Sequence, residues 1–112
     1  MGVKTLNLNS DFSKIEMGES EKKVSNQEMT TRVILNVILT YASQIKGLNS
    51  SERKVYYNIN DSFQEAVKKN VESIQLDDVE VGFIRKCFRE AKLTPNDILR
   101  KVEETLEAVK DR

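Results

Sequence analysis

Few side chains in this sequence could carry out chemistry. There is no histidine and only one cysteine, Cys87, so no Ser-His-Asp triad, Cys-His pair or common structural zinc site can form. The four glycines are isolated, so the chain contains neither a phosphate-binding loop nor a dinucleotide fingerprint. These absences favour a protein that is not an enzyme and that holds no cofactor or metal ion.

One acidic cluster, Asp77, Asp78 and Glu80, has side chains of the type that bind metal ions. Its spacing lacks the alternating donors, central glycine and distal glutamate of an EF-hand loop. Asp77 followed three residues later by Glu80 has the spacing of a capping box, and acids are stabilised at a helix N-terminus. The sequence therefore predicts a helix start here. Cys87 falls on the apolar face of the same helix and is expected to fill the core.

Four cations project from the opposite side of this helix: Arg85, Lys86, Arg89 and Lys92. They could contact the phosphates of a nucleic acid or an acidic partner protein. A solvated outer face explains the same pattern, and few Asn, Gln or Ser side chains accompany the cations to read base edges. Because the formal net charge of the chain is also zero, nucleic-acid binding is the alternative function.

The apolar periodicity predicts an all-α fold, a compact bundle of about four helices with a polar, largely extended N-terminal arm. A chain of 112 residues with one proline fits a single domain of long helices. The arm comprises residues 1–28, in which alternating Leu6 and Leu8 indicate a short strand within 3–9. The helical domain comprises residues 29–112, with helices expected at residues 30–46, 50–69, 77–92 and 95–110.

The helix at 50–69 is the element around which the others are expected to pack. Asn49 and Glu52 have capping-box spacing at its start, and Asn70 after two lysines ends it. Residues 71–76 become an extended connection that places Ile74 and Leu76 on the core.

The other boundaries rest on similar signals. Thr30 or Thr31 is expected to cap the first helix, Gly47 to end it, and Thr94 followed by Pro95 to begin the last helix. The core-facing stripes of the first and third helices include Ile45 and Val79, respectively.

The first helix carries a second apolar stripe of Leu35, Leu39 and Ala42. A helix that is apolar on two sides is either sandwiched inside the bundle or used at an interface. Further interface candidates are the outward Tyr57 and the apolar residues of the arm. The arm is either a mobile tail or is anchored, on its own domain or on a partner, through Phe12, Ile15 and Met17.

The order of features resembles small helical proteins encoded by phages and prophages, mostly without assigned function. The matching segments are LNSSERKVYYNI, with Leu48, Glu52, Arg53, Tyr56 and Ile59, and IQLDDVEVGFI, with Leu76, Asp77, Glu80 and Ile84. The resemblance spans roughly residues 29–109 and implies a viral accessory or assembly role, with no functional residues carried over.

The leading hypothesis is a non-enzymatic protein-interaction or assembly module that binds a protein partner or another copy of itself. No apolar run approaches the roughly 18 residues that a membrane span requires, so no membrane partner is expected. A single cysteine and the lack of an apolar signal segment make the cytoplasm the expected compartment.

Overall fold

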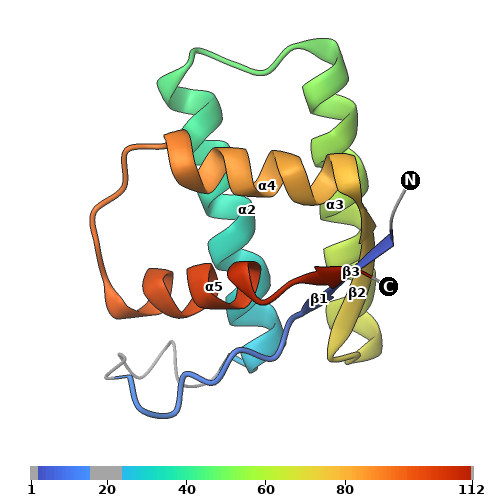
Figure 1. Ribbon diagram of the computed structural model, residues 1–112, viewed down its shortest axis with the longest axis vertical. Coiled ribbons are helices and arrows are strands. Elements are labelled where there is room, and N and C mark those ends of the chain that lie inside the picture. Colours follow the sequence, from blue (N-terminus) through green and yellow to red (C-terminus); the bar gives the residue numbers. More distant parts are fainter. Residues whose placement is uncertain (1–2, 16–23, 112) are drawn as a thin grey trace.

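The computed structural model describes residues 3–15 and 24–111, and it shows a mostly helical molecule with a small sheet (Figure 1). The elements along the chain are β1 (Val3–Asn7), α2 (Asn26–Gln44), α3 (Ser50–Lys69), β2 (Ser73–Asp77), α4 (Asp78–Glu90), α5 (Asp97–Glu107) and β3 (Lys110–Asp111). The four predicted helices are present. The all-α assignment is wrong, because the three strands form a sheet in the order β2-β1-β3.

The helices are arranged around an antiparallel pair, α2 and α3. A short connection joins these helices at one end, and at the other the Gln27 side-chain amide donates to Asn70 Oδ1 at 3.3 Å. Helix α4 packs across both of them, α5 packs against α2, and the sheet contacts α3 through β2 (Figure 1). Within the described part of the chain, no helix has the length and apolar character needed to cross a membrane.

The sheet pairs the start of the chain with the connection between α3 and α4. Strand β1 runs antiparallel to β2, with Val3 opposite Asp77 and Leu6 opposite Ile74. On its other side β1 pairs with β3. Leu6 and Ile74 are both buried, so the apolar alternation of each segment places its apolar side chains on the core and its polar ones outside.

The core draws on both the helices and the first residues of the chain. The fully buried large side chains include Leu6, Leu8, Phe12, Ile34, Ile38, Ile59, Phe63, Leu76, Ile84 and Val102. Three of these belong to the segment expected to be a polar, extended arm. At Leu6, Leu8 and Phe12 that segment is packed into the domain, because its few apolar residues fill the space beside the sheet and helices.

Two helix starts follow the local capping signals. At α3, Asn49 Oδ1 accepts from Glu52 N at 2.8 Å and Asn49 N donates to Glu52 Oε1 at 3.1 Å. At α4, Asp77 and Glu80 make the same reciprocal pair at 2.8 and 3.0 Å. Helix α3 has the predicted bounds, and Asn70 ends it in the left-handed conformation with φ 54°.

Helix α2 begins earlier than predicted. Ser25 is its N-cap, with Oγ accepting from Glu28 N at 3.1 Å. Thr30, one of the two predicted caps, lies inside the helix, where its hydroxyl donates to Asn26 O at 2.8 Å. At the other end α2 stops at Gln44, and the left-handed residues are both Lys46 and the predicted Gly47, with φ 64° and 114°.

The last two helices are shorter than predicted. Helix α4 ends at Glu90 rather than at residue 92. Helix α5 spans Asp97–Glu107 rather than 95–110, because Asn96 rather than Thr94 is its N-cap. Two expected core residues are exposed, Ile45 by 44% and Val79 by 63%. Ile45 lies just past the end of α2, and Val79 lies in the first turn of α4.

Candidate interaction surfaces

A wide hollow of the surface lies between α2 and the start of α5. We call it the α2–α5 groove, and its volume is about 1010 Å³. It is lined by Ile15, Met29, Arg32, Val33, Asn36, Val37, Thr40, Leu93, Thr94, Asn96, Asp97, Ile98 and Leu99. The groove therefore brings together α2, the connection between α4 and α5, the first turn of α5 and the segment after β1.

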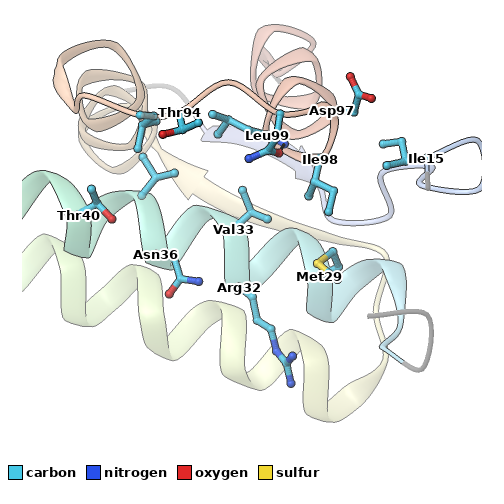
Figure 2. Close-up of a pocket in the computed structure, with 13 residues that line it drawn as sticks. Ile15, Met29, Arg32, Val33, Asn36, Thr40, Thr94, Asp97, Ile98 and Leu99 are labelled. Atoms are coloured by element: carbon cyan, nitrogen blue, oxygen red, sulfur yellow. Dashed lines mark hydrogen bonds between the residues drawn. The ribbon is translucent and has the colours of Figure 1, made fainter. Parts of the chain in front are cut away.

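The floor of the groove is apolar. Met29, Val33 and Val37 follow one another at a spacing of four, so they lie on one face of α2. Met29 and Val37 are buried, whereas Val33 and Ile98 are only partly buried against the core. Figure 2 shows Val33 of α2 and Ile98 of α5 both directed into the groove, with Ile15 at one end. These side chains offer apolar surface that the residues described by the structure cover incompletely.

The rim of the groove is polar, and several of its side chains already have partners. Arg32 pairs with Glu28 at 2.9 Å, and Asn96 Oδ1 accepts from Leu99 N at 2.7 Å as the cap of α5. Asp97 lies in the first turn of α5, where its carboxylate is 3.4 Å from Arg100. An apolar floor with a mixed-charge rim is typical of a surface that binds an amphipathic segment of a protein.

The second stripe of α2 divides between the interior and the surface. Leu35 is 9% exposed and belongs to the core, and Ala42 is half-buried. Leu39, one turn from Leu35, is 50% exposed. Tyr57 on α3 is 55% exposed, and its ring lies 6.0 Å from that of Tyr56 in an edge-on arrangement. Leu39 and Tyr57 are thus the accessible members of the predicted interface.

The apolar residues of the arm lie in different places. Phe12 is 2% exposed and is part of the core. Ile15 is partly buried and lines the α2–α5 groove. Met17 lies outside the described residues. The structure therefore places Phe12 as an anchor on its own domain and leaves Ile15 at a surface hollow.

The four cations of α4 and the loop after it do not act as one group. Arg85 donates to Leu106 O at 3.0 Å at the end of α5. Lys86 lies 3.6 Å from a Glu52 carboxylate oxygen and 5.8 Å from the centre of the Tyr41 ring. The pKa of Lys86 is raised, and the largest cause is its interaction with the Tyr41 side chain.

The remaining two cations are exposed. Arg89 lies 3.9 Å from Glu90, and the backbone of Lys92 bonds the side chain of Gln44. Several of these cations therefore already interact with carboxylate or carbonyl oxygens of the protein. These partners weaken the positive electrostatic potential that the predicted basic face could offer to a polyanion.

The candidates for chemistry have structural roles. Asp77 and Glu80 form the capping box of α4, and Asp78 lies 3.4 Å from Lys4. Among the described residues, no group of three or more acidic or cysteine side chains is arranged to hold a metal ion. Cys87 is buried, and burial raises the pKa of its thiol to about 12, so the thiolate needed for nucleophilic attack is scarce at neutral pH.

The groove itself was not expected from the sequence. Ser25 and Glu28 have the capping-box spacing that starts α2 four residues before Met29, and this signal would have placed Met29 in line with Val33 and Val37. Ile98 lies near this face of α2 only because of the path of the connection between α4 and α5, and no local sequence pattern predicts that path. Comparisons with protein-family models, curated proteins and solved structures each return no match.

Proposed function

We propose that this protein is a non-enzymatic protein-interaction module that receives an amphipathic helix of a partner protein in the α2–α5 groove. The observation that carries the proposal is the partly covered apolar floor, with Val33 and Ile98 directed into a hollow of about 1010 Å³. Binding sites for apolar segments combine such a floor with a few polar groups at the edge.

The shape of the groove favours a helix as the occupant. Its α2 wall extends from Met29 to Thr40, which corresponds to about 16 Å at the helical rise per residue. That length accommodates about three turns of a partner helix, whose apolar side chains would recur at intervals of three and four residues. Arg32 on α2 and Asp97 on α5 provide one cation and one anion for the polar flanks of such a helix, although Arg32 already pairs with Glu28 and Asp97 with Arg100.

The test is a selection of binders from a displayed library of amphipathic helical peptides. Selected peptides are then measured against the wild-type protein and two variants, Ile98→Glu and Leu39→Glu. Ile98 lines the groove and is the second residue of α5, where an acid is favourable to the helix N-terminus, so the fold should be retained. Leu39 is an exposed leucine that does not line the groove, which makes Leu39→Glu the matched control.

Ile98→Glu is expected to weaken peptide binding by about tenfold or more, because an apolar contact is replaced by a carboxylate that must be desolvated. Leu39→Glu should leave the affinity unchanged. Urea unfolding of each variant checks that the fold is intact. Peptides that bind all three proteins equally, or that lose affinity only with Leu39→Glu, would show that the groove is not the binding surface.

A further inference from the structure

Strand β2 is an edge of the sheet. In the order β2-β1-β3, its five residues Ser73–Asp77 pair with β1 on one side only. Among the described residues, no strand lies against its other side. The strand rests on α3 (Figure 1), and a hollow of about 240 Å³, lined in part by Val71, Ile74 and Gln75, opens between α3 and β2.

The hydrogen-bond pattern shows which backbone groups point outward. Leu8 N donates to Glu72 O at 2.8 Å, so Leu8 and Glu72 are a hydrogen-bonded pair. Bonded and non-bonded pairs alternate along an antiparallel ladder, so Ile74 bonds Leu6 while the N–H and C=O groups of Ser73 and Gln75 face away from β1. The outward N–H of Asp77 agrees with this, since it donates to Glu80 Oε1 at 3.0 Å.

This edge has little of the usual protection against pairing. Natural edge strands are blunted by lysine, proline, a bulge or a covering segment. Of the three side chains that alternate outward, Ser73 and Gln75 are neutral and only Asp77 is charged, and the strand pairs in unbroken register without lysine or proline. Two residues therefore present their unpaired N–H and C=O groups to any extended backbone that approaches.

We propose that β2 pairs antiparallel with β2 of a second copy of this chain, with Gln75 opposite Gln75 at a two-fold axis. Such an interface is self-complementary, as a symmetric dimer requires. The N–H of each Gln75 donates to the C=O of the other, and Ser73 of one copy lies opposite Asp77 of its partner. The two small sheets then become one continuous sheet with the hollow beside β2 covered.

Charge supports a second copy as the occupant. Lys68 and Lys69 end α3 before β2, whereas Asp77, Asp78 and Glu80 begin α4 after it. Antiparallel pairing brings the lysines of each copy toward the acidic end of the other, although Lys69 already pairs with Glu65, Asp78 pairs with Lys4, and the exposed Glu72 faces the partner's acidic end. An opposite-charge arrangement of this kind favours one orientation and register.

Exposed apolar side chains flank the strand symmetrically. Val71 and Val79 each lie four residues from Gln75, and they are 39% and 63% exposed. A two-fold axis through Gln75 places the segment that holds Val71 next to the partner's segment that holds Val79. Burial of Val79 in a dimer would remove from water apolar surface that the described part of the chain leaves exposed.

Sedimentation equilibrium of the wild type, Gln75→Lys and Gln64→Lys tests the proposal. Gln75 is exposed, so Gln75→Lys should fold normally while placing two ammonium groups opposite each other across the axis. We expect the dissociation constant of the dimer to rise about fivefold or more. Gln64→Lys makes the same chemical change on the exposed surface of α3. This control variant should leave the dissociation constant of the dimer unchanged.

A cysteine pair gives an independent readout. Directly opposed residues in a hydrogen-bonded pair have Cα atoms about 5.5 Å apart, a separation that a disulfide spans. Because the native Cys87 is buried, oxidised Gln75→Cys should form a covalent dimer, and Gln64→Cys should not. A wild-type protein that is monomeric at its highest soluble concentration, or equal dimerisation of the two lysine variants, would overturn the proposal.

The dimer does not depend on the proposed peptide groove. Ile98 lies on α5 and does not line the hollow beside β2, so Ile98→Glu is expected to dimerise like the wild type. Gln75→Lys is likewise expected to bind selected helical peptides normally. Failure of one proposal can therefore be distinguished from failure of the other.

Discussion

Gln44 and Lys92 hold each other by two reciprocal hydrogen bonds. Gln44 Nε2 donates to Lys92 O at 2.8 Å, and Lys92 N donates to Gln44 Oε1 at 2.7 Å. The pair fastens the last residue of α2 to the chain that leaves α4. Because the same chain then leads to Thr94 and the start of α5, this contact fixes one wall of the α2–α5 groove.

Removing this pair should destabilise the fold moderately. Gln44→Ala deletes two exposed hydrogen bonds, each worth about 1 kcal/mol net, so the free energy of unfolding should fall by about 1–2 kcal/mol in urea titration. Gln64→Ala is the matched control, since Gln64 makes only a 3.5 Å contact with Asn60, and its effect should stay within about 0.5 kcal/mol. Equal losses in the two variants would contradict this role of Gln44.

A second polar contact ties the segment after β1 to α5. The hydroxyls of Ser10 and Thr105 lie 2.6 Å apart, and Ser10 is only 5% exposed. Thr105→Val leaves the Ser10 hydroxyl without this partner, which should cost about 1–3 kcal/mol. Adding Ser10→Ala to Thr105→Val should restore part of that loss, because the orphaned hydroxyl is gone. A double-mutant cycle in urea measures the coupling, and strictly additive losses would argue against it.

Truncation of Phe12 tests whether the segment after β1 packs on the domain. Its ring is 2% exposed, and deleting a buried ring typically costs about 3–5 kcal/mol. Phe12→Ala should therefore lower the urea midpoint strongly, whereas Lys14→Ala, at an exposed position two residues later, should change stability by less than about 0.5 kcal/mol. A mobile tail would give two equally small effects.

Local signals in this sequence predict its structure more reliably than pairings between distant segments. The pairs Asn49–Glu52 and Asp77–Glu80 cap their helices as their spacing predicts, because a capping box needs only four consecutive residues. The pairing of Leu6 with Ile74 joins segments far apart in the chain. Alternation indicates that each segment is extended, but it does not identify the partner strand, so it does not predict the sheet.

Competing local signals explain the wrong helix starts. Thr94 followed by Pro95 is a common way to begin a helix, yet Asn96 supplies the capping oxygen to Leu99 N. Thr30 could have capped α2, yet Ser25 does so. The α2–α5 groove depends on both starts and on the Gln44–Lys92 contact. The candidate site was therefore harder to predict than the central helix α3.

Leu35 and Leu39, treated as one stripe by the sequence pattern, should respond differently to truncation. Leu35 is 9% exposed and Leu39 is 50% exposed. Leu35→Ala removes buried methyl groups and should cost about 2–4 kcal/mol, whereas Leu39→Ala should change stability by less than about 0.5 kcal/mol. Thermal or urea unfolding compares them directly. A large loss for Leu39→Ala in a monomeric sample would mean that the helix packs differently from the structure.

Cys87 should make stability fall at alkaline pH. Burial raises the pKa of its thiol from 9.0 to about 12 in the folded protein. Below pH 9 the thiol is protonated in both states and the shift has no effect. Between these two values the unfolded chain loses a proton that the folded chain retains, so unfolding is favoured by up to about 1.4 kcal/mol for each pH unit.

The measurement is urea unfolding from neutral pH to pH 11, for the wild type and Cys87→Ala. All other ionisable side chains are identical in the two proteins, so the difference between the two curves isolates the thiol. The stability of the wild type should decrease more steeply above pH 9 than that of the variant. Because the thiolate is the reactive form, labelling of Cys87 by iodoacetamide should also follow unfolding rather than pH alone. Parallel pH curves, or rapid labelling of the folded protein near neutral pH, would show that the thiol is not held in this buried, protonated state.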